Sequence, residues 1–220
     1  MDKSYWENIG AVVALAGDLP RGGAADALRA RLALAPRPLL AAADGGALLM
    51  RKLGLTPDII LGDGDSLPAE MFPDTPREKY PTAKDFTDGE AALTYAKDHT
   101  EGDIAVCGAF GGRVDHQLAN ILLPIGFGAT AERFILLGDG CICRYCTGRL
   151  VLRGKVGDTV SLLALGGDAE GVTLAGMRYL LANNVIKAGS SLGISNVLEA
   201  PVAEITVEKG CLLVIHYPRQ

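Results

Sequence analysis

The sequence predicts an α/β domain, with a mostly parallel sheet and flanking helices, followed by a smaller all-β sandwich domain. Up to about residue 138, short apolar runs alternate with helical patterns, which is typical of parallel strands joined by crossover helices. The apolar runs are continuous, which indicates strands that are covered on both faces. After residue 137, short apolar segments are separated by glycine-containing turns, which is typical of an antiparallel sandwich. We therefore expect two domains, residues 1–138 and 139–220.

In the first domain, each expected strand is a short apolar run, and each expected helix is a stretch with helical spacing of its apolar residues. Parallel sheets bind ligands at the carboxyl ends of their strands, so the residues that follow each strand are the first candidates for a site. The expected strands are residues 9–16, 39–43, 58–61 and 104–107, and the expected helices are residues 24–34, 47–53, 90–97 and 114–123.

In the second domain, the first expected strand contains Cys141, Cys143 and Cys146. A structural zinc site usually has four ligands in paired spacings, and no matching second pair follows. We therefore interpret these cysteines as small apolar residues of a strand, and reduced thiols fit a cytoplasmic protein. The expected strands are residues 141–152, 159–165, 202–207 and 212–217, with turns at residues 153–155, 166–168 and 209–210.

The composition is that of an ordinary soluble globular chain, with 220 residues, 49% hydrophobic and 21% charged. A net charge of -5 and the absence of a long lysine and arginine run argue against nucleic acid or an anionic membrane as the partner. No apolar stretch reaches the roughly 20 residues of a membrane-spanning helix. The first residues, MDKSYWENIG, lack a signal-peptide pattern, so we expect a cytoplasmic location.

Aspartates gather at the predicted carboxyl edge of the parallel sheet. Carboxylates so close together would repel one another and raise one another's pKa values unless a cation were present. Oxygen-only ligands beside a phosphate substrate favour Mg²⁺. The residues are Asp44 after the second strand, Asp63 and Asp65 after the third, Asp85 and Asp88 before a helix, and Asp115 after the fourth strand.

Glycines lie beside these acids, where they allow tight turns and close approach of main-chain N–H groups to phosphate. Lys84 and Arg113 supply positive charge for phosphate oxygens. Neither G-x-G-x-x-G nor the P-loop pattern occurs, so a nucleotide must be held by another arrangement. The competing interpretation is that the acids are helix caps and turn residues, for which Thr87 and Asp88 before Glu90 are well placed. The glycines are Gly45, Gly46, Gly62, Gly64, Gly111 and Gly112.

The ordered motifs AADGG, PDIILGDGDS, KDFTDGEAAL, GAFGGRVDHQLANI and GISN closely resemble those of the thiamine pyrophosphokinase family. The resemblance extends from about Ala41 to Asn196 and so covers most of the chain. It implies an α/β domain followed by a β-sandwich. It also implies transfer of an intact diphosphate from ATP to the hydroxyethyl group of thiamine, which gives thiamine diphosphate and AMP.

The resemblance also implies roles for individual residues. Asp63, Asp65 and Asp88 would hold Mg²⁺, with Asp44 nearby, and Asp63, Asp65, Asp88 and Asp115 form the catalytic set. Ser195 and Asn196 would contact thiamine, at a site shared between the subunits of a homodimer. Asp88 and Asp115 both remain candidates for the base that accepts the alcohol proton. The ATP contacts would come from Asp44, Gly45, Lys84, Asp85, Thr87 and Arg113.

The chain departs from the family pattern on the thiamine side. Val197 follows the Ser-Asn pair where an acidic residue is common, and the only tryptophan is Trp6. Tyr179 and Tyr217 could replace the usual stacking aromatic residue, but both alternate with apolar neighbours and are expected in the sandwich core. We expect His116, near a helix start, to have a structural or supporting role.

Two other functions fit the same acidic edge. One is a different magnesium-dependent nucleotide enzyme, either a diphosphokinase for another alcohol or a phosphatase. The other is a non-catalytic regulator that binds thiamine or a nucleotide. The presence of every acid in the set argues against the regulator.

Overall fold

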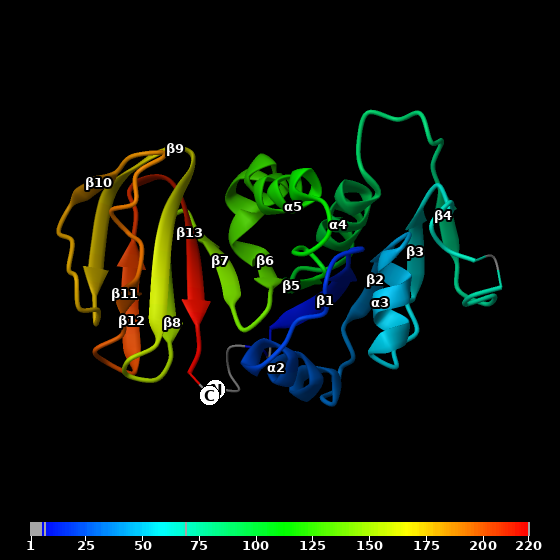
Figure 1. The fold of residues 1–220 in the computed structure, drawn as a ribbon, viewed down its shortest axis with the longest axis horizontal. Helices are drawn as coiled ribbons and strands as arrows, with labels where there is room; N and C mark the ends of the chain where they lie inside the picture. The colour runs from blue at the N-terminus through cyan, green and yellow to red at the C-terminus, as the bar shows by residue number, and fades with distance from the viewer. Residues whose placement is uncertain (1–5, 7, 69, 220) are drawn as a thin grey trace.

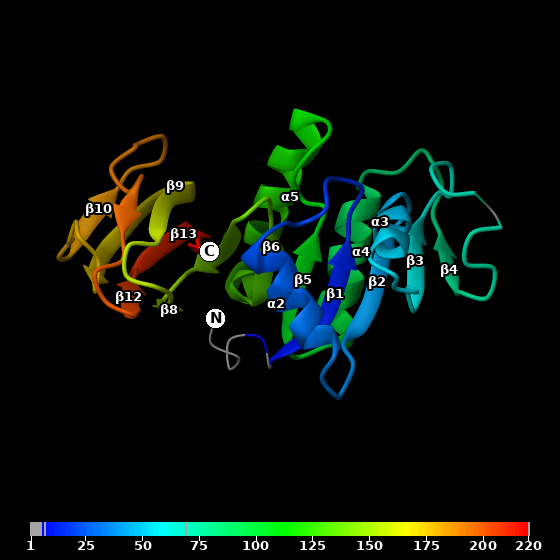
Figure 2. The same cartoon turned by 60° about the horizontal axis from the view of Figure 1, so that its bottom comes forward.

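The structure is a computed structural model that describes residues 6, 8–68 and 70–219. One mixed sheet runs through the molecule in the order β4-β3-β2-β1-β5-β6-β7-β13-β9-β12-β8, with β10 and β11 paired to β9. The helices gather on the half that contains β1 to β6 (Figures 1 and 2). The elements are β1 (Ile9–Ala14), α2 (Gly23–Leu32), β2 (Leu39–Ala43), α3 (Gly46–Lys52), β3 (Ile59–Gly62), β4 (Arg77–Lys79), α4 (Asp88–His99), β5 (Asp103–Cys107), α5 (Val114–Gly126), the 3-10 helix η1 (Gly128–Arg133), β6 (Phe134–Leu137), β7 (Ile142–Cys146), β8 (Arg149–Arg153), β9 (Thr159–Ala175), β10 (Asn184–Ile186), β11 (Asn196–Val197), β12 (Val202–Thr206) and β13 (Lys209–Tyr217).

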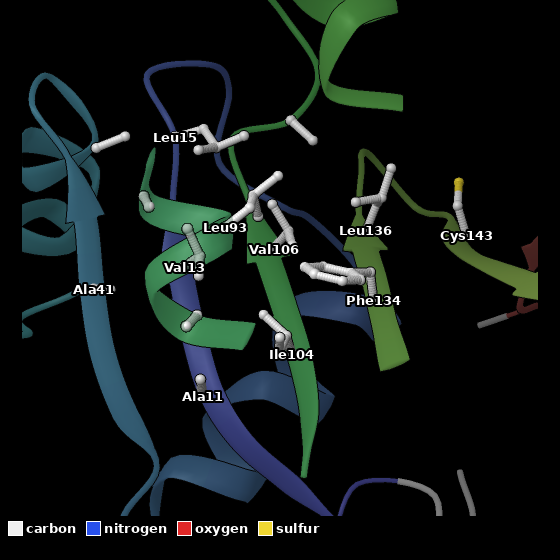
Figure 3. Close-up of a cluster of buried hydrophobic side chains, with 14 of the residues drawn as sticks. Ala11, Val13, Leu15, Ala41, Leu93, Ile104, Val106, Phe134, Leu136 and Cys143 are labelled. Atoms are coloured by element: carbon white, nitrogen blue, oxygen red, sulfur yellow. The ribbon is translucent and has the colours of Figure 1, made fainter. Parts of the chain in front are cut away.

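Strands β1 to β6 are all parallel, as predicted for the first half. Along β1, Ala11 and Val13 face a cluster that includes Leu93 of α4, whereas Val12 faces the opposite cluster with Leu28 of α2. Figure 3 shows the first of these clusters, with Leu93 lying over the sheet. Because helices cover both faces, the strands carry apolar residues at successive positions. The apolar runs in the sequence are continuous because both faces of these strands are buried.

Two strands of the parallel sheet were not predicted. Strand β4 has the sequence Arg-Glu-Lys and lies at the sheet edge, so no apolar pattern marks it. Strand β6 is a short, fully buried apolar run, and periodicity alone does not distinguish such a run from a piece of helix.

The second half is antiparallel, as expected, but three of its predicted boundaries are wrong. The expected turn at residues 209–210 is the start of strand β13, where Lys209 pairs with Glu170. The expected turn at residues 166–168 lies inside the long strand β9 as an irregularity, where the pairing steps from Cys211↔Leu165 to Lys209↔Glu170. Gly166 and Gly167 have positive φ angles there, and such a bulge bends a strand. The expected strand 141–152 is in fact two strands, β7 and β8, separated at residues 147–148.

The bend in β9 allows this one strand to pair with β13 along its first part and with β10 and β12 along its second part. A single apolar cluster fills the space between, with Val160 and Leu162 from the first part and Val172 and Leu174 from the second. All five cysteines are free and buried. This confirms that Cys143 and Cys146 serve as apolar residues of β7.

A buried aspartate closes the end of the second half. Asp158 accepts hydrogen bonds from the main-chain N–H groups of Lys155 (2.9 Å) and Arg219 (2.8 Å). His216 Nε2 lies 2.8 Å from its Oδ2. Burial raises the pKa of Asp158, but these hydrogen bonds outweigh burial, and its pKa is lowered. Asp158 therefore links the turn before β9 to the end of β13.

The two halves are joined by main-chain pairing and by side chains. Strand β6 pairs antiparallel with β7. The Tyr145 hydroxyl of β7 donates to the carbonyl of Ile121 in α5 at 2.7 Å, and Glu132 of η1 accepts hydrogen bonds from Thr147 and Gly148. The predicted boundary at residues 138–139 falls in the connection between the paired strands, and the division into two domains stays a prediction. No helix in the described ranges is long and apolar enough to cross a membrane.

Candidate active site

A cleft of about 370 Å³ lies at the carboxyl edge of the parallel sheet. Its walls come from the segments that follow β1, β2, β3 and β5, from the start of α4 and from the first turns of α5. This is the edge at which the sequence predicted a site. The cleft-lining residues include Asp44, Gly45, Ser66, Thr87, Asp88, Arg113, His116 and Asn120.

Asp44 is buried at the base of this cleft, with 3% of its surface exposed. Its Oδ2 accepts a hydrogen bond from the Ser66 N–H at 2.9 Å, but no described residue donates to its Oδ1. Burial raises the pKa of the Asp44 carboxyl above its ordinary value, and the charges of Asp88 and Asp65 add to this. A buried carboxylate oxygen without a hydrogen-bond donor is a suitable ligand for a cation.

The carboxylates of Asp63 and Asp65 complete an oxygen-rich group with Asp44, because ligand atoms of all three lie within 4.8 Å of one another. The Asp65 N–H donates to Asp63 Oδ1 at 3.2 Å and lowers the pKa of that carboxyl. The Ser66 hydroxyl donates to Asp65 Oδ1 at 2.8 Å. Three carboxylates without a nitrogen or sulfur donor fit a hard cation such as Mg²⁺. The structure thus groups Asp44, rather than Asp88, with Asp63 and Asp65.

Asp88 lies beside this group but is paired with a lysine. Lys84 Nζ lies 2.8 Å from Asp88 Oδ1, and this contact raises the pKa of Lys84. A Cβ placed on Gly62 would lie 2.7 Å from the Asp44 Cβ and 3.1 Å from Asp88 Cγ. Only glycine at residue 62 therefore lets both acids approach the end of β3.

The cap interpretation is confirmed for Thr87, whose hydroxyl accepts a hydrogen bond from the Glu90 N–H at 3.0 Å at the start of α4. The same residue lines the cleft, so capping and a place in the site are compatible. Asp85 is exposed and is not among the described residues that line the cleft.

The segment 108–113, which we call the glycine loop, has an unusual arrangement of main-chain groups. Gly108, Gly111 and Gly112 have positive φ angles. The carbonyls of Gly108 and Phe110 accept hydrogen bonds from the segment after β1. In the described part of the chain, the N–H groups of residues 109–113 have no acceptor. A run of free N–H groups in such a loop forms a concave site for an anion.

Arg113 and Asp115 form a two-point ion pair at the surface, through guanidinium Nε and Nη2. The Arg113 hydrogen bonds lower the pKa of Asp115, which makes Asp115 a weaker proton acceptor. Asp115 is not among the described residues that line the cleft, whereas its neighbour His116 is. Asn120, one helical turn beyond His116, also lines it and was not singled out from the sequence, although it lies within the motif GAFGGRVDHQLANI.

The GISN segment lies in the second half, where Asn196 is buried. Its Oδ1 accepts from the N–H groups of Tyr179 (3.0 Å) and Val197 (2.8 Å), and its Nδ2 donates to the Tyr179 carbonyl at 2.8 Å. Ser195 is exposed, and its N–H donates to the Ser161 hydroxyl at 3.1 Å. Asn196 therefore holds the main chain of Tyr179, and the structure does not bring the GISN segment to the cleft of the same chain.

The expectation that Tyr179 and Tyr217 belong to the sandwich core is wrong, because they are 62% and 46% exposed. The Asn196 side chain holds Tyr179 in an irregular segment before β10, outside the regular alternation of a strand. Tyr217 is the last residue of β13. Other large apolar side chains are exposed near Tyr179 in the sequence and on α5; they are Leu180, Leu192 and Ile194, and Val114, Leu118 and Leu122.

Comparisons with known proteins agree with this geometry. Residues 30–134 match the family model of the thiamin pyrophosphokinase catalytic domain, and residues 149–212 match that of the thiamin pyrophosphokinase vitamin B1 binding domain. The chain is 27% identical over 198 residues to thiamine pyrophosphokinase 1 of Oryza sativa subsp. japonica, which covers 80% of this chain and 71% of the relative. It is 28% identical over 179 residues to thiamine pyrophosphokinase of Bacillus subtilis (strain 168), which covers 78% and 84%.

A crystal structure of thiamine pyrophosphokinase from Bacillus subtilis is also similar, with a TM-score of 0.81 and 25% identity. The match covers 96% of this chain and 100% of that one. Both family models and the fold over nearly the whole length therefore agree. The chain belongs to the thiamine pyrophosphokinase family.

Proposed function

We propose that the cleft at the carboxyl edge of the sheet binds ATP with Mg²⁺ and presents its β-phosphorus to the hydroxyl group of thiamine. As a thiamine pyrophosphokinase, the chain transfers pyrophosphate from ATP to thiamine. The observation that carries the proposal is the buried Asp44 carboxylate, which has one oxygen without a donor among the described residues and lies with Asp63 and Asp65 at the cleft that the glycine loop also lines.

The carboxylates of Asp44, Asp63 and Asp65 would hold Mg²⁺, with Asp88 next to them. When bound, the ion would neutralise negative charge on the phosphates of ATP. Ser66 fixes the position of two of these carboxylates through its main-chain N–H and its hydroxyl. Ser66 therefore links the carboxylate after β2 to one of the two after β3, and such hydrogen bonds hold ligands in position.

The nucleotide phosphates would lie against the free N–H groups of the glycine loop. Arg113, Thr87 and Gly45 line the same cleft, and the Lys84 ammonium lies at its edge through the contact with Asp88. Main-chain N–H groups and cations together match a chain of phosphate oxygens. Asp85 is exposed, so its predicted contact with ATP has no support from the geometry.

We assign the proton acceptor to Asp88 rather than to Asp115. Both carboxylates are ion-paired, Asp88 with Lys84 and Asp115 with Arg113. Only Asp88 lines the cleft, however, and the pKa of Asp115 is lowered. As the thiamine oxygen bonds to the β-phosphorus, the bond from this phosphorus to the bridging oxygen of the α-phosphate breaks. The bridging oxygen leaves with AMP, and the alcohol proton passes to Asp88. Holding the reactants in line supplies much of the rate in such transfers.

We propose that the active form is a homodimer in which the partner's GISN segment and Tyr179 complete the thiamine site. Four strand spacings separate β5, below the cleft, from β9, which pairs with β11; at about 4.8 Å each this is roughly 19 Å. A thiamine molecule is too small to contact both the cleft and the GISN segment of the same chain across that distance. The exposed Val114, Leu118 and Leu122 follow the i, i+4 spacing of one helix face, which suits an interface between subunits.

We further propose a cytoplasmic location for the enzyme. All five cysteines are free and buried. Reduced thiols of this kind are usual in a reducing compartment.

One assay separates the proposed function from the alternatives. The protein is incubated with ATP, Mg²⁺ and thiamine, and the products are separated by chromatography. A thiamine pyrophosphokinase gives AMP and thiamine diphosphate in equal amounts. A phosphatase gives phosphate without thiamine diphosphate, whereas a diphosphokinase for another alcohol and a regulator both leave thiamine and ATP unchanged.

Subunit mixing tests the shared site. Asp63→Asn and Asn196→Ala proteins, each expected to have low activity, are mixed and allowed to exchange subunits. Random pairing gives half mixed dimers with one intact site each, so about a quarter of wild-type activity should return. No recovery, with exchange verified by a mass tag, would mean that each chain builds its own site.

A further inference from the structure

We propose that Asn120 is a positioning residue, which holds the glycine loop in the shape that binds the phosphates of ATP. The inference rests on the proposed function, because it concerns the same cleft. Asn120 is half-buried on α5 and lines the cleft. Its side-chain Nδ2 donates a hydrogen bond to the Ala109 carbonyl at 3.2 Å.

Four carbonyl groups of this loop accept hydrogen bonds from two different parts of the molecule. The segment after β1 binds two of them, since the Gly17 N–H donates to Gly108 O and the Asp18 N–H to Phe110 O. Side chains of α5 bind two more, since Gln117 Nε2 donates to Gly112 O at 3.3 Å and Asn120 to Ala109 O. Among the described residues, only Asn120 donates to the Ala109 carbonyl.

The peptide bond between Ala109 and Phe110 is planar, so its C=O and its N–H point in opposite directions. When Asn120 holds the Ala109 carbonyl toward α5, the Phe110 N–H is fixed on the other side, where it has no acceptor among the described residues. Without Asn120, the Ala109 carbonyl has no donor among the described residues, and this peptide is less firmly held. Gly111 and Gly112, which follow it and line the cleft, would then present their N–H groups less precisely to the phosphates.

Asn120 also lies against the start of α4. A Cβ placed on Gly89 would lie 3.4 Å from Asn120 Oδ1, so the amide fills the space between the glycine loop and the helix that carries Asp88. The side chain is thus confined on both sides, and the position of its donor is well defined.

The test compares wild type with Asn120→Leu, which has a similar volume but no donor, and with Asn120→Ala in case leucine prevents folding. The matched control is Asn184→Leu, because Asn184 is exposed on β10 and its side chain bonds only to the next residue. The ligands are α,β-methylene ATP, whose α–β bridge is not cleaved, and adenosine, which lacks phosphates. Binding with Mg²⁺ is measured by calorimetry, and amide exchange of the loop by mass spectrometry.

We expect the Kd of α,β-methylene ATP to rise about fivefold to tenfold in the Asn120 variants, as for the loss of one hydrogen bond that orients a binding group. The affinity for adenosine and the KM for thiamine should stay within about twofold of wild type. With the analogue bound, amides of residues 109–113 should exchange faster than in wild type, because their hydrogen bonds to the phosphates are weaker. The Asn184→Leu control should match wild type throughout.

An analogue Kd within twofold of wild type, or unchanged exchange in the loop, would overturn the role of Asn120. Equal loss of analogue, adenosine and thiamine binding would mean a general structural defect and would also overturn it. The proposed function fails separately, if wild type binds the analogue but does not convert thiamine. If wild type does not bind the analogue, both the proposed function and the role of Asn120 are contradicted.

Discussion

Two buried aspartates, one in each half of the molecule, are held in opposite ways. Asp44, in the cleft, has one oxygen bonded to Ser66 and one that no described residue contacts as a donor. Asp158, at the end of the second half, has both oxygens occupied by main-chain N–H groups and by His216. Both are at most 3% exposed. Burial is therefore the same for the two residues, and the number of donors differs.

The difference decides whether each carboxylate stabilises the fold. The pKa of Asp44 is raised, so its contribution to stability is present below the ordinary value of 3.8 and is lost as the pH rises through the raised pKa. The pKa of Asp158 is lowered, so its contribution is present above 3.8 and is lost as the pH falls through the lowered pKa. At neutral pH, Asp158 stabilises the protein, whereas Asp44 is held at a cost, as is usual for a functional site.

The largest effect is expected from Asp44→Asn. Turnover should fall by about a thousandfold, because the change removes a charge that positions the phosphates, while the melting temperature without ligands should rise. The rate of AMP formation and calorimetry measure the two effects. The exposed Asp74→Asn serves as a control. Turnover above a tenth of the wild-type value at saturating Mg²⁺ would contradict a functional role for Asp44, and with it the contrast between the two aspartates.

Removal of Asp158 should lower the stability of the protein and leave its turnover unchanged. Asp158→Ala leaves three donors without an acceptor, so the free energy of unfolding should fall by about 3 kcal/mol. The melting temperature should drop by roughly 6–12 °C, with turnover per folded molecule at 25 °C unchanged. An unaltered melting temperature would mean that the three donors find water or other acceptors.

A smaller effect should appear in the pH dependence of stability. Relative to Asp44→Asn, wild type should lose stability as the pH rises from 3.8 through the raised pKa of Asp44. Above that pKa, the gap between the free energies of unfolding of the two proteins should stay constant. The gap between wild type and Asp158→Ala should instead shrink as the pH falls below 3.8. Urea denaturation at a series of pH values measures both gaps. Parallel curves for wild type and both variants would contradict the assigned directions.

The smallest effect is expected on the KM for thiamine when Tyr179 is replaced. This measurement tests whether the second half of the molecule contributes to substrate binding. If the ring of Tyr179 stacks on thiamine, Tyr179→Ala should raise the KM for thiamine about fivefold, since an aromatic pair contributes roughly 0.5–1.5 kcal/mol. Tyr179→Phe should stay within twofold, and the KM for ATP should not change in either variant. Equal KM values for thiamine in all three proteins would leave Tyr179 without a role in binding.

The carboxyl-edge site could be predicted from the sequence, because the ends of parallel strands meet at one edge wherever the helices lie. The grouping of Asp44 with Asp63 and Asp65 could not, since it depends on side-chain directions at each strand end. Asn120 carries no pattern of its own, and its role depends on the peptide that it faces.

The second half was less predictable because its contacts join distant residues. Asp158 and His216 are 58 positions apart, and no spacing rule relates them. The pair Gly166-Gly167 resembles a turn in the sequence, and only the pairing with β13 makes it a bulge. The contact of Asn196 with thiamine stays a prediction, and no pattern in the sequence indicates that its amide also holds the main chain of Tyr179.

The central place of β13 in the sheet has a consequence for the nascent chain. Strand β13 is the last of the described strands in chain order, yet it lies between β7 and β9. Until residues 209–217 leave the ribosome, β7 and β9 each present an unpaired side, and β7 is apolar apart from Arg144. Unpaired edges of this kind recruit other chains. Ribosome-bound intermediates of this protein should therefore depend on chaperones until the final strand enters the gap.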